Sequence, residues 1–511
     1  MYAQGIRRNT GSPSGDCCWN QPVTRESQAG PYGVTERSVL VPRKPGNAGG
    51  GKGPQLEINA TSNAERGLAM SLTTPASVQK LQTALHAKAK ESPGFRFYAL
   101  YDKVYRKDIL AHAYLCCKAN GGAAGVDDQR FEDIEAYGEE RWLDELAQEL
   151  KSRNYRPLPV RRVYIPKAEG KSKRPLGIPA IRDRVAETAA MLVLEPIFEA
   201  DLPSEQYGYR KGRSALDAVR RVHQLVNTGH REIVDADLSS YFDEVPHSEL
   251  LQSLRRRIAD GAMLHLLKMW LETPVEDIDD RGHRHRSTRN RDEGKGTPQG
   301  SPISPLFSNL YMRRFVLGWK HLGYEGRLQA EIVSYADDFV ICCGHGAEQA
   351  LTAARQMMTK LKLTINEAKT RVCRLPEESF DFLGYRIGRC YSATTGKAYL
   401  GTLPSKKRVQ RICREISEAT RLQLTQRDAQ TVVKTINRKL LGWSNYFCLG
   451  PVSKAYRAID QHTSRRLRRW LSAKHKVKAG RISRSADEIL YAEFGLVRLT
   501  QRTGSFPWAK T

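Results

Sequence analysis

The sequence predicts an α+β fold that continues into an all-helical, strongly basic region. Between residues 74 and 404, segments with apolar residues every three or four positions are interspersed with segments in which apolar and polar residues alternate. Only the helical spacing is found beyond residue 404. The length of 511 residues is enough for about two to four domains, and the hydrophobic content of 40% is enough to give them buried cores.

The charge balance points to a polyanionic partner. The chain carries 82 Lys and Arg residues against 56 Asp and Glu residues, which gives a net charge of +26. Because each phosphate that a protein neutralises releases counterions, such an excess favours binding to nucleic acid. A basic surface with no such role is the alternative, which net charge alone leaves open.

Cysteine spacing and apolar runs argue against a zinc or redox motif, a membrane span and a secretion signal. The ten cysteines never show the C-x-x-C spacing of zinc sites and redox motifs, so we expect reduced thiols. No apolar run approaches the roughly 20 residues that a membrane span needs. The N-terminal "MYAQGIRRNT" also lacks the apolar core of a secretion signal. We therefore expect a cytoplasmic protein that has no membrane partner.

Residues 1–75 are predicted to form a flexible leader. They are rich in Gly, Ser, Pro and Asn, and such a segment buries too little surface to offset the entropy lost on ordering. The stretch "GNAGGGKG" at residues 46–53 imitates a phosphate-binding loop. However, Gly53 stands where Ser or Thr would hold magnesium, and no apolar strand precedes the stretch. We interpret it as a glycine linker.

The elements that follow are predicted from local patterns. "LYDKVYRKDILAHAYLCCKAN" (residues 100–120) predicts a helix that is closed by Gly121 and Gly122. "RPLPVRRVYIPK" (residues 156–167) alternates like a strand. "SALDAVRRVHQLV" (residues 214–226) is predicted to be a helix with four apolar residues on one face: Leu216, Val219, Val222 and Val226.

Beyond residue 404 two apolar stripes predict two helices of a separate, basic domain. The first stripe consists of Val409, Ile412, Ile416 and Ala419. The second consists of Val433, Ile436, Leu440, Trp443 and Phe447. Nine Lys or Arg residues then lie between residues 465 and 484, a density typical of a surface that follows phosphates.

Adjacent aspartates interrupt the apolar segment "EIVSYADDFVICC" (residues 331–343). A polar pair between two β-prone segments fits a tight turn, with Asp337 and Asp338 at its tip. A second segment, "REIVDADLSSYFDEV" (residues 231–245), also leads an apolar strand into acids. In it Val234, Ala236 and Leu238 face one way, and Ile233, Asp235 and Asp237 face the other.

Carboxylates at the ends of two strands suggest a metal site. Phosphoryl transfer from a nucleoside triphosphate can use two divalent ions about 3.5 to 4 Å apart, and carboxylates are ligands that Mg²⁺ prefers. Without metal, clustered aspartates would repel one another and raise one another's pKa. A plain turn that contains Asp is the alternative at residues 335–338.

Further motifs accompany these acids. Residues 335–338 resemble the Y-x-D-D turn of reverse transcriptases, and Asp237 with "LSSYFD" resembles their first palm acid. "GTPQGSPISPLFSNLYM" (residues 296–312) is similar to the P-Q-G-x-x-x-S-P-x-x-x-N-x-Y motif of the branch encoded by bacterial group II introns. "KRPLGIPAIRDRV" and "QYGYRKGRSALDAV" resemble its fingers motifs, "FDFLGYRI" its primer-grip hairpin, and "LLGWSNYF" its maturase domain. These motifs occur in the family's order.

The resemblance implies a right-hand polymerase. Residues 76–390 would form fingers and palm with an antiparallel sheet. Residues 391–460 would form an all-α thumb and maturase (X) domain, and residues 461–511 a basic tail suited to binding DNA. No paired cysteines and histidines follow residue 447, so we expect no endonuclease domain.

The resemblance also implies residue roles. The catalytic acids, which would hold two Mg²⁺ ions, are Asp237, Asp337 and Asp338. The residues that would bind a deoxynucleoside triphosphate are Lys167, Arg174, Phe242 and Gln299. Lys167 and Arg174 would grip the triphosphate, and their alternative is a pair of solvated charges. Phe242 would lie beneath the sugar and reject a 2′-hydroxyl, and its alternative is an ordinary core residue. Gln299 would lie beside the incoming nucleotide.

By this resemblance the chain is an RNA-directed DNA polymerase that binds its group II intron RNA, assists splicing and copies the intron into DNA at a target site. Its partners would be that RNA, an RNA template with a DNA primer, target DNA and deoxynucleoside triphosphates. Three alternatives stay open: a maturase that acts only in splicing, a relative recruited to phage defence or another role outside introns, and a nucleic-acid-binding protein without polymerase activity.

His283 and His285 lie in the charged segment "PVEDIDDRGHRHRSTRNRDEGK" (residues 274–295). Two nearby histidines suggest a metal site. We interpret the segment instead as a solvent-exposed hairpin, because it is charged throughout.

Overall fold

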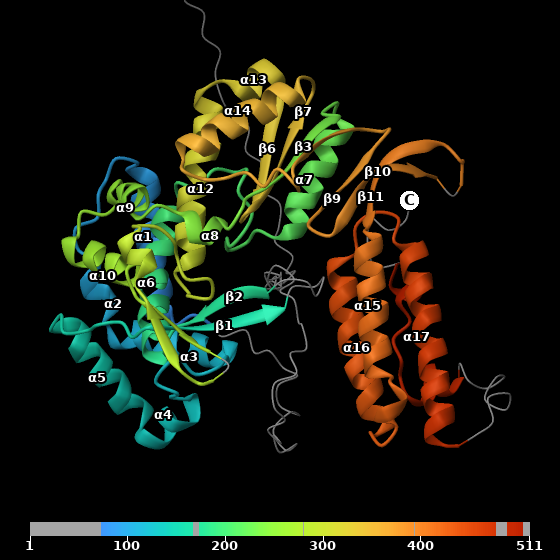
Figure 1. Ribbon diagram of the computed structural model, residues 1–511, viewed down its shortest axis with the longest axis horizontal. Coiled ribbons are helices and arrows are strands. Elements are labelled where there is room, and N and C mark those ends of the chain that lie inside the picture. The colour runs from blue at the N-terminus through green and yellow to red at the C-terminus, as the bar shows by residue number, and fades with distance from the viewer. Residues whose placement is uncertain (1–72, 167–172, 280, 393, 477–487, 504–511) are drawn as a thin grey trace, which may run out of the picture. The chain divides into compact units, whose positions relative to one another are not determined.

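The computed structural model describes residues 73–166, 173–279, 281–392, 394–476 and 488–503 (Figure 1). All of them belong to the second of two compact units, Val41–Thr511. The leader predicted over residues 1–75 lies outside the described residues except for its last three, and α1 (Ala76–Glu91) begins directly after them. Helices and strands are mixed as far as residue 404, and only helices follow in the described ranges, which confirms the α+β prediction with a helical C-terminal region.

The N-terminal helices form one packed group. They are α1, α2 (Tyr101–Val104), α3 (Lys107–Asn120), α4 (Phe131–Tyr137), α5 (Glu139–Lys151) and α6 (Ile181–Glu199). Helix α6 contacts α1, α2 and α3. The single helix predicted from residue 100 is two helices, because Arg106 has an extended backbone with a ψ of 136°. Helix α3 ends, as predicted, at Gly121, whose φ is +62°.

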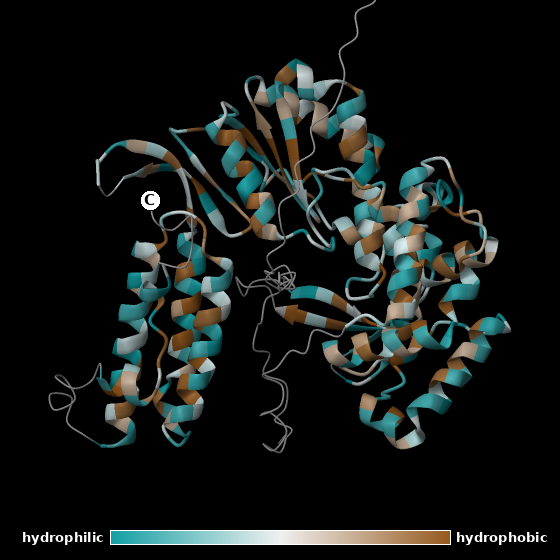
Figure 2. Ribbon diagram, turned by 180° about the vertical axis from the view of Figure 1, so that it is seen from behind, coloured by the Kyte–Doolittle hydropathy of each residue, from teal (hydrophilic) through white to brown (hydrophobic). Residues whose placement is uncertain are grey.

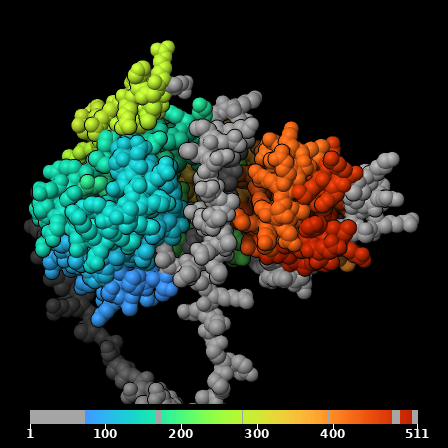
Figure 3. Space-filling model, turned by 90° about the horizontal axis from the view of Figure 1, so that it is seen from below, coloured from blue at the N-terminus to red at the C-terminus, as the bar shows by residue number. Residues whose placement is uncertain are grey.

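The first sheet carries the predicted exposed hairpin. Its strand order is β2-β1-β4-β5. The strands are β1 (Val160–Pro166), β2 (Lys173–Ile178), β4 (Val275–Ile278) and β5 (Arg284–Ser287). Strand β5 is exposed at every position, and this part of the chain projects from the surface in yellow-green in Figure 3. The prediction of a solvent-exposed hairpin around His283 and His285 is therefore confirmed.

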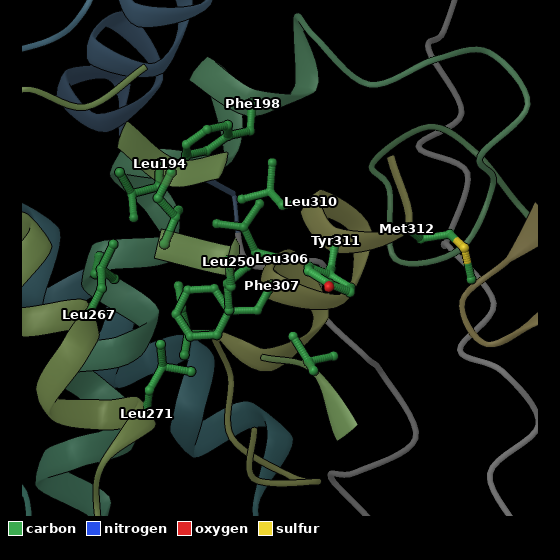
Figure 4. Close-up of a cluster of buried hydrophobic side chains, with 14 of the residues drawn as sticks. Leu194, Phe198, Leu250, Leu267, Leu271, Leu306, Phe307, Leu310, Tyr311 and Met312 are labelled. Carbon is green, nitrogen blue, oxygen red and sulfur yellow. The ribbon is translucent and has the colours of Figure 1, made fainter. Parts of the chain in front are cut away.

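The second sheet is antiparallel, with the order β6-β7-β3-β8. Its strands are β3 (Glu232–Asp237), β6 (Ala330–Tyr335), β7 (Asp338–Cys343) and β8 (Arg371–Arg374). As the alternation predicts, Val234 belongs to the core on one face and Ile233 to the core on the other. The first face is the larger core, and Figure 4 shows part of it, where leucines of α6, α10 and α12 meet.

Helices cover both faces of this sheet. The remaining helices of this region are α7 (Ala215–Asn227), α8 (Tyr241–Glu244), α9 (His247–Arg255), α10 (Gly261–Leu271), α11 (Arg289–Asp292), α12 (Ser304–His321), α13 (Tyr324–Leu328) and α14 (Ala347–Lys360). Helix α7 begins at a capping box formed by Ser214 and Asp217. It buries Val219, Val222 and Val226, which confirms the predicted apolar face.

A third sheet leads into the helical region. Its order is β11-β10-β9, with β9 (Ser379–Phe382), β10 (Tyr385–Tyr391) and β11 (Ala398–Pro404). The motif "FDFLGYRI" forms the β9–β10 hairpin, with Leu383 and Gly384 between the strands. The motif is therefore a hairpin, as the sequence predicts.

The C-terminal region is helical. Its elements are α15 (Lys406–Ala419), η2 (Leu422–Leu424), α16 (Ala429–Tyr446), α17 (Ser453–Lys474), η3 (Ile489–Glu493) and α19 (Leu499–Arg502). Ile412 and Ile436 from the two predicted stripes are buried in one shared core, and Figure 2 shows apolar and polar residues side by side along these helices. Helix α17 runs unbroken through residues 460 and 461, where the sequence suggests a domain boundary.

Candidate active site

The second sheet brings the predicted aspartates together at one end. In the register of β3 with β7, Asp237 is paired with Asp338. In the register of β6 with β7, Tyr335 is paired with Asp338, so the two-residue turn consists of Ala336 and Asp337. Directly opposed residues of an antiparallel pair have Cβ atoms about 4.5 to 5.5 Å apart. Asp237 and Asp338 therefore lie side by side on adjacent strands, and Asp337 lies in the turn directly before Asp338.

The turn of this hairpin is strained and supported from the side. Ala336 has a φ of +58°, which is unusual for a residue with a Cβ atom. A Cβ atom on Gly208 would lie 2.4 Å from the main-chain nitrogen of Ala336. Only glycine therefore lets the motif "QYGY" approach the turn this closely.

Main-chain and amide hydrogen bonds hold that approach. The Tyr207 N–H donates to the Ser334 carbonyl at 2.8 Å, and the Ser334 N–H donates to the Glu205 carbonyl at 2.9 Å. The Asn309 side-chain amide donates to the Gly208 carbonyl at 2.9 Å. Asn309 belongs to the segment at residues 296–312, so two of the quoted motifs meet beside the turn.

Asp237 has two polar partners that the sequence did not reveal. Its Oδ2 accepts hydrogen bonds from Lys369 Nζ at 2.7 Å and from Asn366 Nδ2 at 3.3 Å. Both residues follow α14 in "NEAKTR", where no periodicity or motif used above marks them. The ammonium group of Lys369 partly neutralises the carboxylate cluster.

Another acid lies on the same face of β3. The pKa of Asp235 is raised to about 6, mainly by burial and to a smaller extent by the nearby Asp338 and Asp381. Arg371 opposes this shift, with its Nε 3.6 Å from Asp235 Oδ2. The negative charge of the site thus extends along β3 beyond the predicted acids.

The donor set is suited to a divalent metal ion. Carboxylate oxygens are the ligands of hard cations such as Mg²⁺, and the register brings at least two carboxylates from adjacent strands together. Within the described ranges, no group of three His, Cys, Asp or Glu side chains is closely enough arranged to hold a metal as it stands. His283 and His285 both contact Asp279 in the exposed hairpin without forming such a group.

Phe242 and the segment 296–303, which we call the Pro-Gln-Gly loop, are joined through their main chains. The Thr297 N–H donates to the Phe242 carbonyl at 2.7 Å. Phe242 itself is half-buried and packs against Tyr241 with ring centroids 5.6 Å apart. The main chain that follows Asp237 is therefore tied to the loop at Phe242.

The Pro-Gln-Gly loop lies against β2. The Gly177 N–H donates to the Gln299 carbonyl at 2.6 Å. Gly300 has a φ of +122°, and a Cβ atom there would lie 2.3 Å from the Gly177 carbonyl oxygen. Arg174 is exposed on the same strand. Lys167 lies outside the described residues.

A cavity of about 410 Å³ opens between these elements. Gln299, Gly177 and Asp243 are among the residues that line it. Two buried polar atoms of its lining, Arg162 Nε and Asn290 Oδ1, have no hydrogen-bond partner in the described part of the chain.

Comparison with known proteins matches these regions to two families. Residues 165–387 match "Reverse transcriptase (RNA-dependent DNA polymerase)", and residues 409–486 match "Group II intron, maturase-specific domain". Protein YkfC of Escherichia coli strain K12 is 34% identical over 368 residues, which are 65% of this chain and 93% of YkfC. The chain belongs to the group II intron-encoded reverse transcriptases and maturases.

Other similarities cover smaller parts. The group II intron-encoded protein LtrA of Lactococcus lactis is 32% identical over 44% of this chain, and the match spans 36% of LtrA. A solved partial Cas6-RT-Cas1–Cas2 complex is 24% identical, with a TM-score of 0.30, over 51% of this chain and 41% of that chain.

In this group II intron-encoded protein the maturase motif "LLGWSNYF" packs against the third sheet. The Tyr446 hydroxyl donates to the Leu383 carbonyl at 2.7 Å, and the Tyr385 hydroxyl donates to the Tyr446 carbonyl. Phe447 is 4% exposed and belongs to the same core as Tyr335 of the β6–β7 hairpin. These aromatic side chains join α16 to the polymerase sheets.

The maturase-specific match extends through α17 to residue 486. Arg465 and Arg469 are exposed on α17, whereas Arg466 donates to carbonyl groups of α15 and its C-terminal end. The helix therefore presents basic side chains to solvent.

No helix in the described ranges is long and apolar enough to cross a bilayer.

Proposed function

We propose that this chain copies RNA into DNA with two Mg²⁺ ions held by Asp237, Asp337 and Asp338. We further propose that it binds its own group II intron RNA, assists its splicing and copies it at a DNA target. The observation that carries the catalytic proposal is the register that pairs Asp237 with Asp338 beside the turn residue Asp337. The family membership supports the type of reaction.

When bound, two such ions would activate the primer 3′-hydroxyl and stabilise the leaving pyrophosphate. The chain itself would contribute position and charge. Phe242, next to the Pro-Gln-Gly loop, would lie beneath the deoxyribose and exclude a 2′-hydroxyl. Gln299 would lie beside the nucleotide base, at the mouth of the cavity that it lines. Arg174, with Lys167, would bind the triphosphate by charge-assisted hydrogen bonds.

The RNA role rests on charge and on the maturase-specific domain. With a net charge of +26, the chain would bind phosphates of intron RNA and of target DNA mainly through its basic helices. A cytoplasmic location in a bacterial cell is part of this proposal.

Primer extension on an RNA template with Mg²⁺ tests the catalytic proposal. Asp337→Asn removes one negative charge from the carboxylate cluster and weakens its hold on metal. We expect the extension rate to fall roughly a thousand-fold, because metal ions contribute several kcal/mol to stabilising the transition state. Binding of RNA should stay the same or tighten, because a charge that repels phosphate is lost.

Asp144→Asn is the matched control. Asp144 is half-exposed on α5 and pairs with Lys107, so this variant should extend primers at the wild-type rate. Equal extension by wild type and Asp337→Asn would refute the site.

A further inference from the structure

Helix α6 carries ionisable groups inside the protein. Asp183, Arg184 and Glu187 are 1%, 8% and 4% exposed. Asp183 accepts hydrogen bonds from the Tyr155 hydroxyl at 2.6 Å and from the Leu158 N–H at 2.9 Å, so it holds the segment that enters β1. The aspartate cluster does not involve Glu187.

Glu187 reaches from α6 to the Pro-Gln-Gly loop. Its carboxyl group accepts a hydrogen bond from the Ser301 hydroxyl and another from the main-chain N–H of Ile303. Ser301 is itself 4% exposed, so water does not compete freely for this contact. A buried hydrogen bond of this kind is costly to break, since each partner is left unsatisfied.

The loop is anchored at three places. Its start is bonded to α8 through Thr297 N–H and Phe242 O, and its middle to β2 through Gln299 O and Gly177 N–H. Its end, where α12 begins, is held by Glu187. Gln299 carries the middle anchor, so the direction of its side chain depends on the main chain that the anchors before and after it hold.

We infer that Glu187 is a positioning residue, which holds the Pro-Gln-Gly loop in the conformation that presents Gln299 to the nucleotide. This inference rests on the proposed function, because it takes the incoming nucleotide to be the ligand of Gln299. Glu187 acts through the loop and does not touch substrate. Its neutral, protonated form is the one that the interior favours.

The surroundings of Glu187 explain this preference. Burial raises the pKa of Glu187 to about 8. The nearby Asp183 also raises it, whereas Ser301, the Ile303 N–H and Arg184 oppose the shift. Tyr155, after α5, and Cys117, on α3, are titratable groups that also interact electrostatically with Glu187. Below this pKa the group is neutral, and above it a buried charge favours a looser, hydrated loop.

Steady-state primer extension, with the KM for a deoxynucleoside triphosphate as the readout, tests the inference. Glu187→Ala should raise this KM about five-fold at pH 7, as expected for the loss of one buried hydrogen bond. Glu187→Gln keeps an acceptor oxygen and should have the wild-type KM at pH 7. The ratio of the wild-type KM to the Glu187→Gln KM should rise as pH passes about 8, because only wild type acquires a charge.

A second readout does not need turnover. Hydrogen exchange of the amides in residues 296–303 should be faster in Glu187→Ala and in Ser301→Ala than in wild type or Glu187→Gln. Glu195→Gln is the control, because Glu195 is a half-buried acid on the same helix that lines a different cavity. It should change neither readout.

The two proposals fail in different ways. Unchanged KM and unchanged exchange in both Glu187→Ala and Ser301→Ala would overturn the positioning role. The same pH dependence in wild type and Glu187→Gln would overturn the role of the neutral form. If wild type incorporated no nucleotide while Glu187→Ala still loosened the loop, the positioning role would stand and the proposed polymerase function would be lost.

Discussion

Gly208 lies so close to the main chain of the β6–β7 hairpin that a side chain would not fit there. That atom would lie 2.4 Å from the nitrogen of Ala336, whose own φ of +58° is strained. A strained turn persists only where neighbours hold it. At this scale, the position of Asp337 depends on a residue that is remote in sequence.

Gly208→Ala is therefore expected to displace the hairpin. The added methyl group must push main chain aside, which costs about 1 to 3 kcal/mol. Primer extension should fall more than stability alone explains, because Asp337 moves with the turn. Thermal unfolding and the extension rate measure the two effects.

Gly326→Ala serves as the comparison. A Cβ atom at Gly326, in α13, would meet no atom within 4 Å, so both properties should match wild type. A Gly208→Ala protein with normal extension would show that the turn does not need this contact.

At the scale of elements, the contact between α16 and the third sheet connects the maturase motif to the polymerase sheets. Trp443 and Phe447 pack with ring centroids 4.6 Å apart, and Tyr385 lies 5.1 Å from Phe447. The same core contains Tyr335 at the end of β6. The maturase motif and the β6–β7 hairpin, which carries Asp337 and Asp338, thus share one set of packed side chains.

Phe447→Ala should lower the stability of the protein and its primer extension together. Loss of a buried Phe side chain costs about 3 to 5 kcal/mol in a well-packed core. We expect a lower denaturation midpoint and lower primer extension, measured on the same preparation. Leu441→Ala changes a side chain that is 37% exposed on the same helix and should alter neither. Normal extension by Phe447→Ala would mean that the β6–β7 hairpin does not depend on its contact with α16.

Charge acts at the scale of the whole molecule. The excess of +26 attracts any polyanion, whereas the three aspartates concentrate negative charge at one sheet end. Binding of RNA and catalysis therefore draw on different residues, so they should be separable by substitution.

The double substitution Arg465→Gln with Arg469→Gln should weaken binding of the intron RNA. Both side chains are exposed one turn apart on α17. The slope of log K against log salt should become shallower by about one for each phosphate contact that is lost. Splicing assisted by the protein should fall in parallel, while Asp337→Asn should still support splicing.

Arg141→Gln, on the exposed face of α5, controls for loss of positive charge alone. An unchanged salt slope in the double variant would place the RNA contacts elsewhere.

The sequence by itself determined the α+β class, the helical stripes of α7, α15 and α16, the family, and the strands that end in acids. These depend on periodicity and on motifs, which are properties of neighbouring residues. The sequence did not predict the break between α2 and α3, because no glycine or proline marks the position of Arg106, whose backbone is extended.

Only the tertiary structure decided which distant residues meet. The pairing of Asp237 with Asp338, the bond from Lys369 to Asp237, and the reach of Glu187 to Ser301 join residues that are 101, 132 and 114 positions apart. Buried polar groups must find partners wherever the packed chain supplies them. That choice is made by how sheets and helices stack, and no local pattern of residues records it.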